Sequence, residues 1–173
     1  MGAAGSAGAT VLVESTQAMD EPNLRNAFEI LTRLLMAVLV GVLIGFERRR
    51  QHKAIGIGGM VLVAMGSTAY MLVGQYLARE DPSALSRTQQ GLMQGIGFLG
   101  GAVIFRGGTD VRGIKTAAAV WITGASGLAI GTGYWVLGLS IGVATALILL
   151  VTDLFPPRSP SAVEQELPPP PLP

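Results

Sequence analysis

Five apolar runs alternate with short charged segments along this chain of 173 residues. The runs cover approximately residues 24–46, 55–77, 88–105, 116–132 and 134–154. A helix needs about 20 residues to cross a bilayer, and the first, second and fifth runs meet this length. The third and fourth runs are shorter and partly polar, which is tolerated where neighbouring helices cover them. The pattern predicts an all-α integral membrane bundle of about five transmembrane helices.

The composition supports a membrane location. Hydrophobic residues make up 50% of the chain and charged residues 13%, whereas a soluble domain carries about 25% charged residues. A soluble protein of this length would lack the polar surface to cover five buried helices. The absence of cysteine excludes disulfides and thiol chemistry.

The two ends of the chain differ from its middle. Residues 1–23 are rich in small residues and lack the basic start and apolar core of a signal peptide. Residues 156–173 are rich in proline, which favours a solvated tail, although a proline-binding partner could dock there. We therefore expect a flexible N-terminal tail (1–23), a transmembrane domain (24–155) and a proline-rich C-terminal tail (156–173).

Two loops are strongly basic and predict the orientation. Their basic residues are Arg48, Arg49, Arg50 and Lys53 after the first run, and Arg106, Arg112 and Lys115 after the third. Loops rich in Lys and Arg stay in the cytoplasm. An odd number of spans then places the N-terminus outside and the C-terminus in the cytoplasm. Tyr134 and Trp135 lie at the predicted outer interface, where aromatic side chains gather.

Glycines recur at four-residue spacing within the runs. The pairs are Gly41 and Gly45, Gly91 and Gly95, Gly97 and Gly101, Gly127 and Gly131, and Gly138 and Gly142. Residues four apart share one helix face, and small residues let helices approach closely in lipid. The stripes indicate packing within the chain, or contact with another copy or another protein. Gly95, Gly97 and Gly100 also match a dinucleotide-binding pattern, but no strand precedes them and no acidic partner follows.

Ionisable residues near membrane spans are candidates for function. Glu29 and Arg33 are four residues apart and are expected to pair on one helix face. Glu47 ends the first run beside three arginines. It could form an ion pair that stabilises the basic turn, or it could be a carboxylate at the mouth of a site. Around Gly107, Asp110 could bridge Arg106 and Arg112; alternatively, the excess of basic groups could hold a lipid phosphate or a small anion.

Three glutamines mark the third run. Gln89, Gln90 and Gln94 place amides on one side of the helix, and Gln94 lies within the span, where it needs a hydrogen-bond partner. The hydroxyl groups that could supply one belong to Ser67, Thr68, Thr116, Thr123 and Ser126. The arrangement suits ordinary interhelical hydrogen bonding, which we favour, or a narrow solute path.

The residues do not indicate catalysis or a metal site. No nucleophile lies at helical spacing from a base. The carboxylates Glu47, Asp110 and Asp153 are scattered along the chain, whereas a magnesium cage needs clustered oxygen ligands. His52 lies in a basic loop and is expected to be solvated. We therefore expect a protein that is not an enzyme, holds no cofactor or metal, and does not bind nucleic acid.

Three segments resemble the MgtC/SapB family of membrane proteins. Residues 33–48 (RLLMAVLVGVLIGFER) are similar to the family's first span, residues 95–101 (GIGFLGG) to its G-I-G-F-L-G-A-G stretch, and residues 111–121 (VRGIKTAAAVW) to its v-R-G-L-T-T-A-A-s-l-W motif. The resemblance extends from Arg33 to about Leu150. The matching positions are Arg33, Glu47, Arg48, Gly95, Gly97, Phe98, Gly100, Arg112, Gly113, Thr116 and Trp121.

This resemblance implies a multi-pass protein of the bacterial inner membrane with four or five spans. Family members are associated with adaptation to low magnesium, acid tolerance and survival inside host cells. The best-known member is thought to restrain the F-type ATP synthase rather than carry magnesium. By resemblance, the partners are membrane lipids, a larger membrane complex such as that synthase, or another copy of the chain.

The chain departs from the family pattern at polar positions. The Arg and Thr of the family's G-l-R-T sequence are replaced by Gly58 and Gly59. Gln94 replaces a usual Ser, and Lys115 replaces a Thr and could restore the lost positive charge. Where some members carry a soluble C-terminal domain, we expect only the proline-rich tail.

Three functions are consistent with these residues. The first is a regulatory or interaction protein that binds a larger membrane complex through its glycine-lined helices. The second is a small transporter or channel subunit with its path beside Gln94. The third is a scaffold that binds anionic lipids through its basic loops.

Overall fold

The computed structural model describes residues 21–50, 55–79, 81–107 and 110–154, with side chains from residue 26 onward except at residue 110. The elements in this part are helix α2 (Glu21–Arg50), α3 (Ile57–Leu77), α4 (Ser83–Ala102), strands β1 (Phe105–Gly107) and β2 (Asp110–Arg112), α5 (Ile114–Gly131) and α6 (Trp135–Leu154). Both predicted tails, His52, and the side chain of Asp110 lie outside this description.

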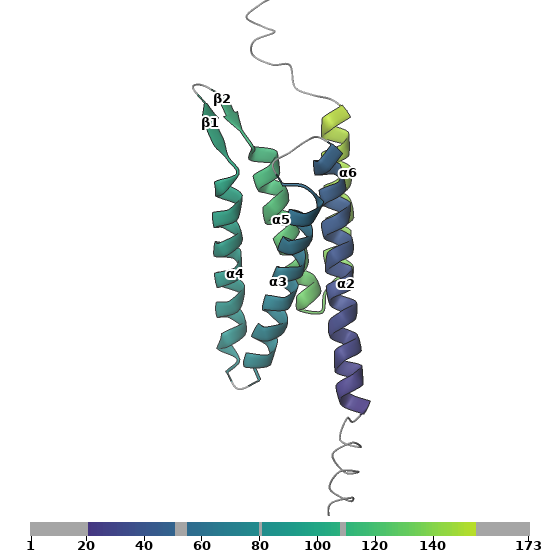
Figure 1. Cartoon of the computed structure of the whole chain (residues 1–173). Coiled ribbons are helices and arrows are strands. Elements are labelled where there is room, and N and C mark those ends of the chain that lie inside the picture. Colours follow the sequence, from purple (N-terminus) through teal and green to yellow (C-terminus); the bar gives the residue numbers. More distant parts are fainter. Residues whose placement is uncertain (1–20, 51–54, 80, 108–109, 155–173) are drawn as a thin grey trace, which may run out of the picture.

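The helices run alternately up and down, so that their ends form two groups (Figure 1). We use the name basic end for the group formed by the last turn of α2, the β1–β2 hairpin, the start of α5 and the end of α6. The opposite end holds the start of α2, the α3–α4 loop and the α5–α6 turn. Both loops that the sequence predicts to be cytoplasmic therefore adjoin the same end, as that prediction requires.

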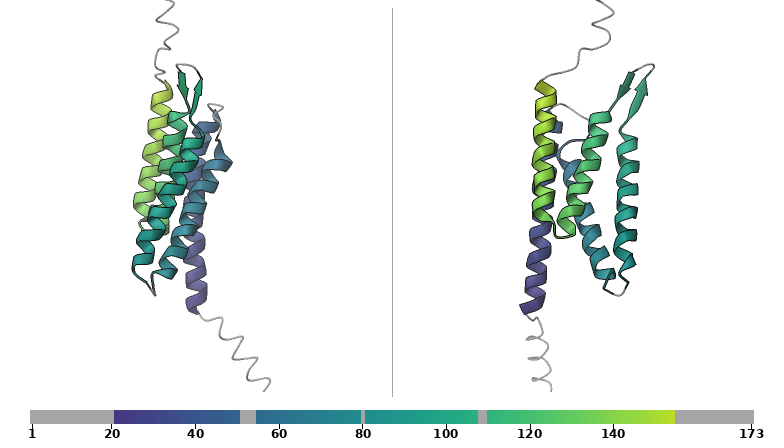
Figure 2. Two further views of the ribbon diagram at one scale, coloured as in Figure 1. Left: turned by 90° about the vertical axis from the view of Figure 1, so that its left-hand side faces the viewer. Right: turned by 180° about the vertical axis from the view of Figure 1, so that it is seen from behind.

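The predicted membrane bundle is confirmed, with a difference at its third run. Among the described residues, four helices are long and apolar enough to cross a membrane: Asn26–Arg50, Ile57–Leu77, Ile114–Gly131 and Trp135–Leu154. Helix α4 is outside this set because its first half is polar, including Arg87 and Gln90. It packs against α3 and α5 at one edge of the bundle (Figure 2).

Helix α5 lies at the centre of the bundle and contacts all four other helices. It is the most buried of the four apolar helices. Gly127 faces the backbone carbonyl of Ala64 on α3, and a Cβ added at Gly131 would lie 2.7 Å from the Cβ of Met71. These two glycines therefore let α5 pack directly on the backbone of α3.

Helix α2 approaches α3 through Gly41 and Gly45. A Cβ added at Gly41 would lie 2.5 Å from the Cα of Val61, and one at Gly45 would lie 2.5 Å from the Cα of Ile57. Because these neighbours are backbone atoms, no side-chain rotation would make room. Any larger residue at either position has to push the two helices apart.

Most glycines of α4 do not contact another helix, although their four-residue spacing predicts helix packing. Gly95, Gly97 and Gly101 have no atom within 4 Å of an added Cβ, and Gly91 meets only the Tyr70 hydroxyl at 3.6 Å. The glycine of α4 that faces the bundle is Gly100, whose added Cβ would lie 3.4 Å from the carbonyl oxygen of Ala117 on α5. Within this chain, packing of α4 therefore does not use the predicted stripe.

Candidate functional site

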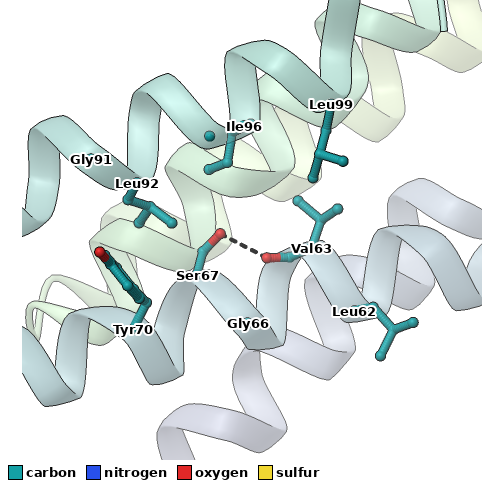
Figure 3. Close-up of a pocket in the computed structure, with 10 residues that line it drawn as sticks. Leu62, Val63, Gly66, Ser67, Tyr70, Gly91, Leu92, Ile96 and Leu99 are labelled. Atoms are coloured by element: carbon teal, nitrogen blue, oxygen red, sulfur yellow. Dashed lines mark hydrogen bonds between the residues drawn. The ribbon is translucent and has the colours of Figure 1, made fainter. Parts of the chain in front are cut away.

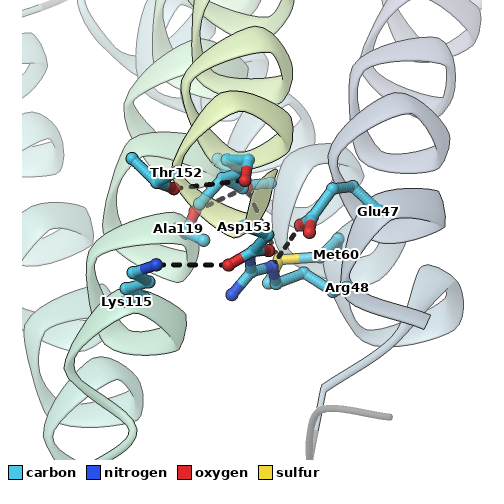
Figure 4. A network of polar contacts seen from close by, with 9 residues as sticks. Glu47, Arg48, Met60, Lys115, Ala119, Thr152 and Asp153 are labelled. Carbon is cyan, nitrogen blue, oxygen red and sulfur yellow. Dashed lines mark hydrogen bonds and ion pairs between the residues drawn. The ribbon is translucent and has the colours of Figure 1, made fainter. Parts of the chain in front are cut away.

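A partly buried ionic cluster joins three helices at the basic end (Figure 4). Arg48, in the last turn of α2, is fully buried (0% exposed). Its Nε donates a hydrogen bond to Oε2 of Glu47 at 2.5 Å, and its Nη2 donates to Oδ2 of Asp153 on α6 at 3.3 Å. Lys115, in the first turn of α5, donates to Oδ1 of Asp153 at 3.1 Å. We call these four residues the ionic cluster.

The charges of the ionic cluster balance. Two cationic side chains face two carboxylates, so the formal sum is zero. Removing a charge from water costs several kcal/mol, and a buried charge is retained only where partners compensate it. The cluster therefore couples the ends of α2, α5 and α6, and loss of Arg48 leaves the buried Glu47 carboxylate without its partner.

Two atoms of the ionic cluster have no hydrogen-bond partner among the described residues. They are Oε1 of Glu47 and Nη1 of Arg48, and both are buried. Buried polar atoms are nearly always paired, so unpaired ones in a native protein need an explanation. Glu47 and Asp153 also line a small pocket of about 180 Å³ at the surface of this end.

A second polar junction lies at the opposite end. Nη1 of Arg33 donates to the carbonyl oxygen of Gly131 at 2.7 Å and to Oε1 of Gln75 at 3.2 Å. Its Nη2 pairs with Glu29, which confirms the pair expected from their spacing. The last carbonyls of a helix lack partners within the helix, so Arg33 satisfies one at the end of α5. This arrangement is a structural junction between α2, α3 and α5.

The β1–β2 hairpin presents basic residues at the basic end. Arg106 pairs with Val111 and Arg112 with Phe105 in the antiparallel register. The side chains of Arg106, Arg112 and Phe105 are all exposed. The hairpin therefore combines positive charge with an exposed aromatic ring, a combination suited to a membrane surface. The predicted bridge by the Asp110 side chain lies outside the described residues.

Gln94 lies on the exposed side of α4, away from the hydroxyl groups proposed as its partners. Those hydroxyls mostly bond helix carbonyls: Ser67 bonds Val63, Thr68 bonds Gly127, and Thr123 bonds Ala119. The favoured expectation of an interhelical bond from Gln94 to this set is wrong for the described chain. Helix α4 is rotated so that Ile96 and Gly100 face the bundle instead.

An apolar groove lies between α3 and α4 (Figure 3). It has a volume of about 370 Å³, and its walls include Leu62, Tyr70, Leu92 and Leu99. Ser67 is a polar residue of the groove, but its hydroxyl donates to the carbonyl oxygen of Val63 at 2.7 Å. The groove therefore offers an apolar surface that suits a lipid chain or a helix.

The start of α4 is held by Asp81 in the α3–α4 loop. Oδ1 of Asp81 accepts hydrogen bonds from the backbone N–H of Ser83 at 2.9 Å and from its hydroxyl at 2.7 Å. The guanidinium of Arg87 pairs with the other carboxylate oxygen. The bonds from Ser83, followed by that from Arg87, lower the pKa of Asp81 to about 2.

The structure thus brings together only some of the predicted site residues. Glu47, Arg48 and Lys115 meet in the ionic cluster, whereas Arg33 lies at the opposite end and Gln94 at the edge of α4. Sequence reasoning missed Asp153 as their partner. The available signal was that Asp153 is an acidic residue at the end of an apolar helix, on the side where basic residues gather.

These features define the class of protein. Four apolar helices of membrane-spanning length are joined at both ends by charged side chains that bond across helices, which is the architecture of an integral membrane helical bundle. Among the described residues, no group of three or more His, Cys, Asp or Glu side chains is placed to hold a metal ion.

The chain belongs to the MgtC family, whose model matches residues 34–156. It is 44% identical over 131 residues to protein SrpB of Synechococcus elongatus, covering 68% of this chain and 71% of SrpB. It is 37% identical over 121 residues to protein MgtC of Brucella abortus, covering 70% of this chain and 49% of that protein. No solved structure matches the chain.

The match to several relatives covers only part of their length. The protein YhiD of Escherichia coli K12, which is named as a candidate magnesium transporter, is 33% identical over 132 residues, or 71% of this chain and 60% of YhiD. The aligned region thus spans about half of the Brucella protein and three fifths of YhiD.

Proposed function

We propose that this protein is a non-enzymatic component of the bacterial inner membrane that associates with a larger membrane complex and regulates it under magnesium or acid stress. The observation that carries the proposal is an open face on α4. This face consists of Gln94, Gly97, Phe98 and Gly101, which recur at the spacing of one helix side. All four are exposed, and Phe98 is 78% exposed.

The chemistry of the open α4 face suits a partner helix. Gly97 and Gly101 have empty space above them, so another backbone can approach closely. Gln94 has an amide that lipid tails do not satisfy and that another helix can bond. The surrounding Phe98 and Leu99 add exposed apolar area. Small residues, one amide and apolar flanks are the features that associate helices in membranes.

A transporter is the second candidate, favoured by the name of the relative YhiD as a candidate magnesium transporter. Such a protein needs a polar path through its core. Here most core hydroxyls are bonded to helix carbonyls, and glycines bring the backbones of α3 and α5 together. These observations favour the regulatory proposal over transport by a single copy.

The test is isolation of the full chain from its native membrane in mild detergent, followed by identification of what accompanies it. We expect a stoichiometric membrane complex with the wild-type protein and a loss of at least about tenfold with Gly97→Leu, because the leucine would separate the helices. The matched control is Gly58→Leu, which also fills empty space but lies on α3.

The outcomes separate the candidates. Equal recovery of the complex with Gly97→Leu and wild type would contradict the role of the open α4 face. Isolation of the chain with no stoichiometric partner would contradict the regulatory proposal. Movement of magnesium ions or protons into proteoliposomes above an empty control would instead support the transporter.

A further inference from the structure

The pocket beside the ionic cluster has a polar wall and an apolar wall. Glu47, Asp153 and Arg50 form the polar wall, whereas Leu150 and Leu154 form the apolar wall. Both leucines are also exposed on the outer surface of α6. The pocket therefore opens where the charged end of the bundle meets the exposed apolar surface of α6.

The polar wall contains an acceptor that needs a donor. The Glu47 side chain is 9% exposed, and its Oε1 has no hydrogen-bond partner among the described residues. Its other oxygen already accepts from Arg48, and both oxygens of Asp153 accept from Arg48 or Lys115. Oε1 has almost no solvent-accessible surface, so a ligand in the pocket reaches it only when the Glu47 side chain turns toward the pocket. A ligand that donates hydrogen bonds and carries positive charge would then satisfy the free oxygen of Glu47.

We propose that this pocket binds the headgroup of a phospholipid with a primary ammonium group, the phosphatidylethanolamine class. The Glu47 side chain turns toward the pocket, and its Oε1 accepts a hydrogen bond from the ammonium, with Asp153 as the second negative group. The phosphate pairs with Arg50, because a guanidinium matches phosphate oxygens in shape and charge. The first part of an acyl chain lies along Leu150 and Leu154.

Charge argues against two other ligands. A divalent cation prefers several free carboxylate oxygens, but among the described residues only Oε1 of Glu47 lacks a hydrogen bond in this cluster, and Arg50 adds a positive charge. A phospholipid that carries only negative charge would place its headgroup against Glu47 and Asp153. A zwitterionic headgroup complements both signs at once.

This inference is independent of the proposed partner at α4, since the pocket involves only α2 and α6. The test uses purified, delipidated full-length protein in detergent and native mass spectrometry with one lipid at a time. The lipids share their acyl chains and carry ethanolamine, N-methylethanolamine, N,N-dimethylethanolamine, choline or glycerol headgroups. We expect affinity to fall along the methylation series and to be roughly tenfold or more lower for choline, because its quaternary ammonium has no N–H donor.

Three variants locate the site. Glu47→Gln should remove the preference for ethanolamine over choline, because the charged acceptor is lost. Arg50→Gln should weaken both lipids to a similar extent, because both contain the phosphate. Arg49→Gln is the matched control: it is the exposed neighbour of Arg50 and does not line the pocket, so it should leave the preference unchanged.

Equal affinity of the wild type for ethanolamine and choline lipids would overturn the proposal, and this result does not depend on any variant folding. Tighter binding of the glycerol headgroup would overturn it in favour of an anionic lipid. Displacement of every lipid by millimolar magnesium chloride, lost in Glu47→Gln, would overturn it in favour of a cation site.

Discussion

Arg48 illustrates how a single residue connects the ends of three helices. Its guanidinium is fully buried and bonds carboxylates from α2 and α6, and Asp153 passes the connection to Lys115 on α5. Glu47 is its neighbour in the sequence, whereas Asp153 lies 105 positions away. A buried ion pair affects stability mainly because breaking it leaves an uncompensated buried charge.

Replacement of Arg48 should therefore be strongly destabilising. Arg48→Met would leave the buried carboxylate of Glu47 without its cation and beside the half-buried Asp153, and we expect a loss of about 3–5 kcal/mol in the free energy of unfolding. Titration with SDS in mixed micelles, followed by circular dichroism, would measure it. Arg49→Gln, at an exposed position, should stay within about 0.5 kcal/mol of wild type. Similar stability of Arg48→Met and Arg49→Gln would contradict the role of the ionic cluster.

At the scale of the elements, a glycine is required for packing only where two helix backbones are in close contact. Gly41 and Gly45 lie against the α3 backbone, whereas Gly95, Gly97 and Gly101 of α4 face open space. The same four-residue spacing of glycines thus occurs both at a tight helix contact and on an open helix face, and only the packing distinguishes the two.

This difference predicts opposite responses to one substitution. Gly41→Ala should destabilise the protein by about 1–3 kcal/mol, because its Cβ would overlap backbone atoms of Val61. Gly101→Ala should be neutral or stabilising by up to about 1 kcal/mol, since alanine favours helix and has space there. Unfolding in SDS would compare the two. Equal effects would argue against the close α2–α3 approach.

The beginning of α4 should depend on pH through Asp81. Its pKa is lowered from 3.8 to about 2, so its contribution is complete above about pH 4 and is lost as the pH falls through about 2. Asp81→Asn should therefore loosen the first turn of α4 near neutral pH but not below pH 2. Hydrogen exchange at the amides of residues 83–87 measures this. A difference between the two proteins that persists unchanged at low pH would contradict this origin.

At the scale of the whole molecule, the alternating helices gather the basic residues at one end. Arg48, Arg49 and Arg50 end α2, and Arg106 and Arg112 lie on the hairpin at the same end. The positive-inside tendency would place this end in the cytoplasm. The side of the membrane remains a prediction, but the common end is a property of the fold.

Site-specific labelling can measure the orientation, because the chain has no native cysteine. In sealed right-side-out vesicles, Ser86→Cys should react with a membrane-impermeant maleimide, whereas Arg106→Cys should react only after permeabilisation. Both positions are exposed; Ser86 lies in the first turn of α4, and Arg106 lies on β1, beyond the other end of that helix. The cysteine-free wild type is the background control. Labelling of Arg106→Cys before permeabilisation would reverse the predicted orientation.

Much of the architecture can be predicted from the sequence alone. Apolar runs of membrane-spanning length predict the helices, because a backbone in lipid must satisfy its own hydrogen bonds. The local spacing of Glu29 and Arg33 predicts their ion pair, since residues four apart lie on one helix face. These features depend on residues close in the chain, so no knowledge of the packing is needed.

Only the tertiary structure decided which faces meet. Asp153 bonds Arg48 across 105 sequence positions, Gln94 lies outside the bundle, and Gly100 rather than Gly97 packs on α5. Helical periodicity defines the faces of α4 but not its rotation, which depends on how all the helices pack together. In the same way, long-range ion pairs form only after several helix ends have been placed side by side, so spacing along the chain carries no direct signal for them.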